Sequence, residues 1–293
     1  MKSMVALIKR EFIEHKGAFL YAPGIIIVIL ALMLGGTLMS NRFQVAYQVG
    51  APSALKFFEF GFLGISVLWF VYLMATLFFY YADAFNADRR NNAMLFWKSM
   101  PVTDFKVLAS KMLAGMTIFP ALVFGALLVT AVLVYFTTLA GVAIFPRLVL
   151  PGVDAFLVSA WHIVSFDVVF IVLALLWYAP FFAWVGMLST FVGRWSIPLA
   201  FLIPGLAGLA ENLIFDGHGP GGGYILNFLK ERFRFYSVED GHLSWVFAED
   251  GVSGELLSGL LAWIDWPQLV GGLIVAALMV YAASEYRRRV VST

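Results

Sequence analysis

The chain has 293 residues, of which 62% are hydrophobic and 13% are charged, and its mean hydropathy is +0.90. Because a soluble domain carries about 25% charged residues, this composition cannot cover a water-facing surface and predicts a protein whose main solvent is lipid. The net charge of +1 gives no bulk basicity for nucleic acid, and the absence of cysteine excludes disulfides, thiolate metal sites and cysteine nucleophiles.

Residues 2–17 have the pattern of an amphipathic helix. Apolar residues recur at helical spacing on one face, and this pattern favours a helix lying on the membrane surface, so residues 1–18 are predicted to be an interface helix. A signal peptide is the competing interpretation, but its charged region would be unusually long and would contain Glu11 and Glu14. The residues of the predicted apolar face are Met4, Leu7, Ile8 and Phe12.

Six long apolar runs follow. About 20 residues at a rise of 1.5 Å per residue cross a hydrocarbon core of about 30 Å, so each run is predicted to be a membrane-spanning helix. Residues 141–164, between the third and fourth runs, contain two prolines and are predicted to be a link resting on the outer interface. The predicted spans are residues 19–39, 57–82, 112–139, 165–192, 197–215 and 266–283.

A long polar insert, residues 216–265, precedes the last span and carries an excess of acidic residues. Residues 224–235 are predicted to form a short helix. Leucine and isoleucine residues within 253–264 fall on one stripe, which predicts an amphipathic helix dipping into the outer leaflet. Because no second soluble domain or internal repeat is evident, residues 1–293 are predicted to form a single transmembrane domain, and an inverted-repeat carrier is not favoured.

Lysine and arginine residues indicate the orientation of the chain in the membrane. With both termini inside, the cytoplasmic segments hold thirteen of the 19 basic residues and the longer outer segments hold six. The predicted fold is therefore an all-α membrane protein with six transmembrane helices and both termini cytoplasmic. It has an amphipathic N-terminal interface helix and an extracytoplasmic helical insert between the fifth and sixth spans.

Residues 83–111 are the strongly basic, polar interruption in the apolar N-terminal half. Residues 89–99 can form a short helix that exposes aromatic side chains among charges, and Pro101 ends it. Thr103 is predicted to be the N-cap of the next helix, with Asp104 in its first turn, where the helix dipole favours an acid. Exposed aromatic residues here either anchor in lipid headgroups or bind a partner. The basic residues are Arg89, Arg90, Lys98, Lys106 and Lys111.

Other polar features are weaker signals. Residues 217–222 match Gly-x-Gly-x-x-Gly but follow a span rather than a strand, and no Gly-Lys-Ser/Thr occurs, so no ATP-phosphate site is predicted in this chain. An ionisable group inside the membrane is a functional candidate because its burial is costly, although these groups lie near the outer interface, where water can solvate them. The candidate pathway or outer-gate residues are Asp167, Glu211 and Asn212.

The residue types that catalysis or metal binding requires do not occur at the spacing or membrane depth that either would need. An intramembrane protease would need paired aspartates, Ser/His or clustered His/Glu at mid-membrane depth, and the span centres lack them. The histidines show no metal-ligand spacing. We therefore predict that the chain is not an enzyme and that it holds no catalytic residue, metal or cofactor. The histidines are His15, His162, His218 and His242.

At residues 83–111 the sequence resembles the permeases of ABC-2 type transporters. In that family the loop after the second span reads approximately Glu-Arg, a short helix, a Leu-x-x-x-Pro-Val-Ser-type turn and Gly-Lys opening the third span. The departures are Asp for Glu, Ser for Gly, and Asn-Asn-Ala for the usual Gly-Thr after the charged pair. The corresponding residues here are Asp88-Arg89, Leu95 to Thr103 and Ser110-Lys111.

The resemblance implies a permease subunit of an ATP-driven transporter, most simply an exporter, in a bacterial inner membrane. It implies a dimer of permeases with two separate ATP-binding subunits, and ATP and magnesium would bind to those partners. The loop helix would be the coupling helix that sits in a cleft of the ATPase. The residues assigned to the ATPase contact are Arg89, Arg90, Phe96, Trp97 and Lys98, with Pro101 fixing the elbow.

Two alternatives stay open. In the first, an ATPase moves the insert at residues 216–265, which acts on an extracytoplasmic partner, so the chain is a mechanical or sensory module. The second and less favoured alternative is an intramembrane enzyme. The sequence does not specify a cargo.

Overall fold

The computed structural model describes residues 2–39, 53–90, 103–144, 152–214, 223–233, 235, 252 and 254–290, and within these residues all regular secondary structure is helical. The long helices are α2 (Ala22–Met39), α4 (Ala54–Arg90), α7 (Ile118–Ile144), α8 (Val153–Val192), α9 (Ser196–Ile214) and α13 (Trp266–Val290). The short helices are α1 (Lys2–Glu14), η1 (Gly17–Tyr21), α6 (Asp104–Met116), η2 (Gly193–Trp195), α10 (Tyr224–Phe233) and α12 (Glu255–Trp263).

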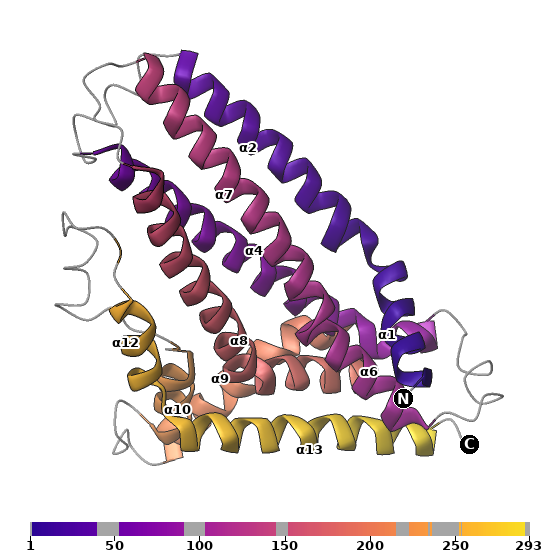
Figure 1. Ribbon diagram of the computed structural model, residues 1–293. Coiled ribbons are helices and arrows are strands. Elements are labelled where there is room, and N and C mark those ends of the chain that lie inside the picture. The colour runs from indigo at the N-terminus through magenta and orange to yellow at the C-terminus, as the bar shows by residue number, and fades with distance from the viewer. Residues whose placement is uncertain are drawn as a thin grey trace.

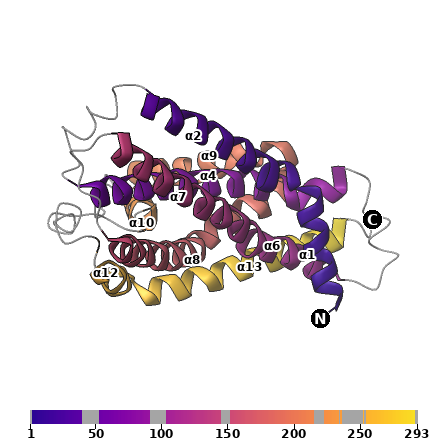
Figure 2. The ribbon, with the colours of Figure 1, turned by 45° about the horizontal axis from the view of Figure 1, so that its top comes forward.

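Helix α4 lies at the centre of the bundle. It packs against α7 and against α8, while α2 runs along α7 and α13 packs against α8 (Figures 1 and 2). The core between α4, α7 and α8 is apolar, and Leu73, Leu127 and Ile163 are each exposed by 1% or less. This core fixes the long helices relative to one another.

Five segments of the described residues are long and apolar enough to cross a membrane. The protein is therefore an all-α, multi-pass membrane protein. The fourth segment holds both α8 and α9, which the sequence predicts as two spans, and η2 joins them through Gly193 at a φ of 60°. The segments are Gly17–Met39, Ala54–Asp88, Asp104–Ile144, Val153–Ile214 and Trp266–Arg289.

The predicted link at residues 141–164 is wrong, because most of it is helical. Helix α7 continues through Ile144, and α8 begins at Val153. Phe156 and Ile163 in this first part of α8 are buried in the main core. Packing against protein therefore extends the helix beyond the length that the membrane requires. The 40 residues of α8 span about 60 Å, compared with about 30 Å of hydrocarbon.

Helix α1 confirms the predicted N-terminal helix, but its apolar face packs on protein rather than on lipid. Leu7 is buried and Ile8 packs against the main core, because α1 lies against α6. Phe19, in η1, is also buried and stacks on Phe119 of α7 with ring centroids 3.8 Å apart. The large apolar side chains that α1 exposes are Val5 and Ile13.

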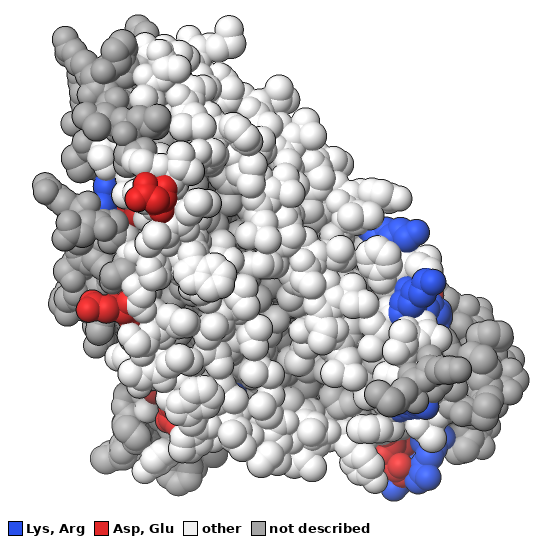
Figure 3. Space-filling view, in the orientation of Figure 1, with Lys and Arg blue, Asp and Glu red and all other residues white. Residues whose placement is uncertain are grey.

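Charge distinguishes the two ends of the molecule. Most visible lysine and arginine side chains gather where α1, α6 and the C-terminal turns of α13 lie, and a broad uncharged surface separates them from acidic side chains at the opposite end (Figure 3). We call the first region, which also includes the last turns of α4, the basic end. Helix α1 begins and α13 ends there (Figure 1). This arrangement is typical of a protein whose two ends meet water on either side of a membrane.

The two helices predicted within the polar insert are confirmed as α10 and α12. The apolar stripe of α12 faces protein, because Leu260 and the following Ile264 are buried in a cluster with Leu173 and Trp177 of α8. The prediction that this stripe dips into the lipid leaflet is therefore wrong for these residues. Helix α12 instead covers the side of α8.

Arg232, in the last turn of α10, anchors the insert between α8 and α13. Its Nη2 donates to the Trp177 carbonyl at 2.8 Å and its Nη1 donates to the Gln268 carbonyl at 2.9 Å. The guanidinium also lies 4.2 Å from the centre of the Trp177 ring. Burial lowers the pKa of Arg232 from its ordinary value. The guanidinium of Arg232 fits here because residue 272 is a glycine. A Cβ atom on Gly272 would lie 2.1 Å from Nη2 of Arg232.

Glu59 of α4 provides a second attachment for the insert. Its carboxylate accepts the backbone N–H of Val252 at 2.9 Å and the ammonium of Lys56 at 2.9 Å. It also accepts the hydroxyl of Ser159 on α8. Glu59, Lys56 and Ser159 are all buried, so this contact joins the chain before α12 to both α4 and α8.

Replacing Arg232 should loosen the insert without unfolding the bundle. Arg232→Gln leaves buried carbonyl groups without their donors, which costs about 1–3 kcal/mol and should raise the rate of local opening about tenfold or more. Limited proteolysis of the protein in lipid vesicles measures this as faster cleavage within the insert. Gly272→Ala, which displaces the guanidinium, should act in the same direction.

The matched control is Lys230→Gln, because Lys230 lies on the same helix and is exposed. Its cleavage rate should equal that of the unchanged protein. Equal cleavage rates for Arg232→Gln and Lys230→Gln would contradict the anchoring role of Arg232.

Candidate functional site

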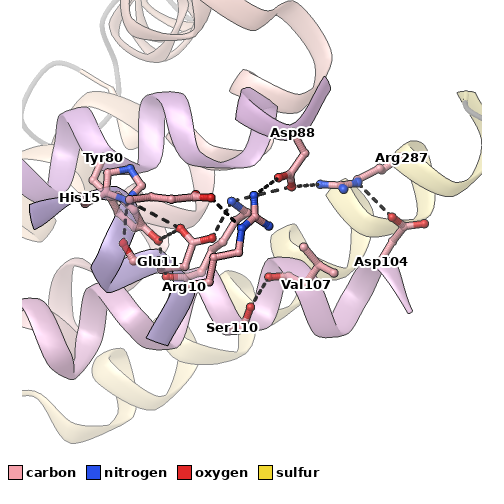
Figure 4. Close-up of polar contacts among 11 residues, drawn as sticks. Arg10, Glu11, His15, Tyr80, Asp88, Asp104, Val107, Ser110 and Arg287 are labelled. Atoms are coloured by element: carbon pink, nitrogen blue, oxygen red, sulfur yellow. Dashed lines mark hydrogen bonds and ion pairs between the residues drawn. The ribbon is translucent and has the colours of Figure 1, made fainter. Parts of the chain in front are cut away.

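Buried charged side chains from four helices meet at the basic end (Figure 4). The exposed fraction is 2% for Glu11, 2% for Asp88, 1% for Lys111 and 4% for Arg287. Asp104 completes the group at its edge. We call these five residues the basic-end network; they come from α1, α4, α6 and α13.

Glu11 joins α1 to both α6 and α4. Its Oε1 accepts the ammonium of Lys111 at 2.9 Å, and its Oε2 accepts the hydroxyl of Tyr80 at 3.0 Å. The Tyr80 ring in turn packs edge-on against His15, with ring centroids 4.8 Å apart. One buried carboxylate on α1 therefore holds side chains from two other helices.

Arg287 joins α13 to the end of α4 and to the start of α6. Its Nη1 donates to Asp88 Oδ2 at 3.0 Å, and its Nε lies 3.0 Å from Asp104 Oδ1. Asp88 has two further cations nearby, since Lys111 Nζ and Arg10 Nη2 each lie 3.8 Å from its carboxylate. Three helices therefore depend on the position of one guanidinium.

The cost of burying these charges makes the network sensitive to the loss of any member. Taking ions out of water costs several kcal/mol each, and their mutual attraction offsets this only while every partner is present. Arg287 Nε and Nη2 are both buried, and neither makes a hydrogen bond to the residues that the structure describes. The ion pairs of Arg287 therefore leave part of its hydrogen-bonding capacity unused.

The network lies on both sides of the segment that joins α4 to α6. Helix α4 ends at Arg90, two residues after Asp88, and α6 begins at Asp104. Because Arg287 pairs with Asp88 and with Asp104, the two helix ends that flank residues 91–103 are tied to α13. A force on that segment would act on all three helices.

Glu11, Glu14 and His15 form a group whose ligand atoms lie within 4.8 Å of one another. Glu11 already pairs with Lys111, and Glu14 pairs with Arg10 at 2.6 Å. Because both carboxylates are engaged with cations, we assign no metal site to this group.

Two of the six predicted ATPase-contact residues fall within the described helices. Arg89 and Arg90 end α4, but their side chains lie outside the described residues, so their contact role stays a prediction. Thr103 is confirmed as the N-cap of α6, since its hydroxyl accepts the Lys106 N–H at 3.3 Å, and Asp104 is confirmed in the first turn. The other contact residues, also outside the described residues, are Phe96, Trp97, Lys98 and Pro101.

The three candidate pathway residues lie in different surroundings. Asp167 is buried between α8 and α4, where its Oδ2 lies 2.6 Å from Ser66 Oγ. Glu211 caps the N-terminus of α10, because its carboxylate accepts the N–H groups of Tyr224 and Ile225 at 2.7 Å each. Asn212 is exposed near the end of α9. The structure does not bring these residues into one site, and their pathway role stays a prediction.

Sequence reasoning missed the basic-end network because its members were interpreted as surface charges. The available signal was charge inside an apolar stripe. Glu11 follows Leu7 by four residues on the buried face of α1, and Lys111 follows Val107 and Leu108 on the buried face of α6. A charged residue at such a position predicts a buried partner, although it does not identify that partner.

Comparison with protein-family models, with curated proteins and with solved structures finds no match to this chain.

Removing one charge from the network should destabilise the protein strongly. Arg287→Gln removes the cation that lies 3.0 Å from the buried Asp88 carboxylate, and breaking a buried ion pair from one side costs about 3–5 kcal/mol. The melting temperature of the detergent-solubilised protein should fall clearly. The measurement is a thermal unfolding curve followed by intrinsic tryptophan fluorescence.

Arg288→Gln is the matched control, because Arg288 is the next residue and its side chain is 72% exposed. Its pairing with Glu285 is screened by solvent, so its melting temperature should stay close to that of the unchanged protein. Similar melting temperatures for the two variants would show that the buried pairs of Arg287 do not hold the helices together.

Proposed function

We propose that the chain is the membrane-spanning permease subunit of an ATP-driven transporter, coupled to a separate ATP-binding subunit through residues 83–111. The observation that carries the proposal is the position of the basic-end network. Arg287 ties Asp88 and Asp104, which lie within residues 83–111, one on each side of residues 91–103. A partner that pushes on this segment would therefore move α4, α6 and α13 together.

The lengths of the helices support this proposal. Helix α4 has 37 residues and packs against both α7 and α8, so a displacement at the basic end would be carried through the core of the bundle. The chain also has no Gly-Lys-Ser/Thr pattern for nucleotide phosphates, so the energy would come from a partner that binds ATP and magnesium.

The finer features of the proposal follow from the sequence motif and the basic residues. We propose six crossings with both termini and the basic end in the cytoplasm, a dimer with a second permease copy or paralogue, and export across a bacterial inner membrane. The excess of basic residues in the inner segments supports this orientation, since such residues favour the cytoplasmic side.

A second candidate function is a mechanical module that acts on an extracytoplasmic partner. The observation that favours it is the attachment of the insert, because Arg232 is buried against α8 and α13 and Val252 is bound by Glu59 of α4. Helix movements would then be transmitted to the insert. A hydrated pathway through the dimer would favour transport, whereas a sealed apolar contact would favour the mechanical module.

The first test is isolation of the tagged, detergent-solubilised chain from its native membrane. We expect a separate protein with ATP-hydrolysing activity to co-purify in a fixed ratio, because the proposal requires an external source of energy. A well-folded chain that purifies alone from several mild detergents would overturn the permease proposal and the mechanical one.

The coupling segment is tested by the double variant Phe96→Ala, Trp97→Ala. Removing two aromatic anchors from an interface costs about 2 kcal/mol or more each, so stimulated ATP hydrolysis of the complex should fall at least tenfold. The melting temperature of the chain alone should be unchanged. The measurement is ATP turnover by the reconstituted complex.

The matched control is Phe136→Ala, Trp161→Ala, which removes the same residue types from exposed positions on α7 and α8. Both positions lie in the helix halves away from the basic end, so ATP turnover should be retained. Unchanged turnover in the Phe96, Trp97 variant would rule out the assigned contact.

A further inference from the structure

A buried carboxyl group lies between α4 and α8, inside the apolar part of the bundle. The side chain of Asp167 is 5% exposed, and that of Ser66 is 8% exposed. The Oδ2 atom of Asp167 and the Oγ atom of Ser66 are 2.6 Å apart. Neighbouring side chains one turn away on each helix, Phe62, Ile163 and Ile171, are buried and apolar.

No charged group stabilises this carboxyl within the part of the chain that the structure describes. None of the ion pairs of the described residues includes Asp167. Helix α7 and residues 266–284 of α13 contain no charged residue. The charged and titratable side chains on the same halves of the packed helices are Lys56 and Glu59 of α4, Tyr135 of α7, Asp154 and His162 of α8, Glu211 of α9 and Glu255 of α12.

The hydrogen atoms at this site can be counted. Ser66 Oγ lies within hydrogen-bonding distance of two oxygens, Asp167 Oδ2 at 2.6 Å and the Phe62 carbonyl oxygen at 3.1 Å. A hydroxyl has one hydrogen to donate. If Asp167 were ionised, both of these oxygens would be acceptors, and the single hydrogen of Ser66 would have to be shared between them.

A proton on Asp167 satisfies both contacts. The neutral acid donates its O–H to Ser66 Oγ, and Ser66 then donates its own hydrogen to the Phe62 carbonyl oxygen. The separation of 2.6 Å is ordinary for an O–H···O bond. The neutral form also avoids a buried, unpaired charge, which is costly in an apolar interior.

Glu59, two turns away on α4, shows the opposite arrangement. Its carboxylate receives an ammonium hydrogen from Lys56, a backbone N–H from Val252 and a hydroxyl hydrogen from Ser159. These are the partners of an ionised carboxylate. The interface between α4 and α8 therefore contains two acids in different surroundings. The partners of Glu59 fit an ionised carboxylate, and those of Asp167 fit a protonated carboxyl group.

We propose that Asp167 and Ser66 form a proton-binding site between α4 and α8. The ligand is a proton, which forms an O–H bond on Oδ2 of Asp167 and completes the hydrogen-bond chain to the Phe62 carbonyl. Loss of that proton leaves a buried carboxylate with a single donor and weakens the packing of α4 against α8. The proposal does not depend on the permease function.

Infrared spectroscopy of the full chain in lipid vesicles tests the proposal. At neutral pH the protein should show the C=O stretching band of a protonated carboxylic acid, and Asp167→Asn should abolish it. Asp154→Asn, a matched change at an exposed aspartate on the same helix, should retain it. The amide of Asn can also donate to Ser66, so Asp167→Asn should keep its melting temperature close to that of the unchanged protein.

Isotope labelling provides the same test without a substitution. Carboxyl-labelled aspartate should shift the band in the unchanged protein, whereas carboxyl-labelled glutamate should leave it in place. The proposal is overturned if the unchanged protein lacks the band, if labelled aspartate does not shift it, or if it persists in a folded Asp167→Asn variant.

Discussion

Polar contacts spaced along α4 fix the positions of its neighbours. A polar group in lipid has no water to bind, so each contact requires a particular partner at a particular height, whereas apolar packing is non-directional. The contacts, ending at the basic end, are Glu59 to Ser159 of α8, Ser66 to Asp167 of α8, Trp69 to Thr130 of α7, Tyr72 to the carbonyl of Ala18 in η1, Tyr80 to Glu11 of α1 and Asp88 to Arg287 of α13. If α4 were entirely apolar, none of these hydrogen bonds and ion pairs would fix where each neighbouring helix lies along it.

The chemistry of these contacts changes along the helix. Glu59 and Asp88, near the two ends of α4, each have a cation within 3.0 Å. Ser66, Trp69 and Tyr72 lie between them and make hydrogen bonds without a cation. This order follows from the cost of charge, which is greatest far from water. Asp167, the ionisable partner of Ser66 in this middle stretch, fits the same order only in its neutral form.

The sequence predicts features that depend on neighbouring residues, and it does not predict contacts between residues far apart in the chain. The N-cap at Thr103 could be predicted because it depends on residues within one turn, and periodicity likewise predicted α1 and α12. The contact of Asp88 with Arg287 joins residues 199 apart, and nothing in one sequence indicates which helices meet. The helical start of α8 was missed for a related reason. Its length is determined by packing on α4, whereas the prediction assumed the thickness of a membrane.

Helix α13 connects the basic-end network to the anchored insert through one continuous element. Arg287 holds Asp88 and Asp104, while the carbonyl of Gln268 holds Arg232 of the insert. These positions on α13 are 19 residues apart, or about 29 Å at the rise of a helix. A rigid helix transmits a displacement over this length without a relay of side chains. A shift of α4 and α6 that carries Arg287 with it therefore also displaces the contact with Arg232. Both proposed functions, transport and mechanical signalling, would use this connection, and they would differ in whether a pathway opens between the helices as the insert moves.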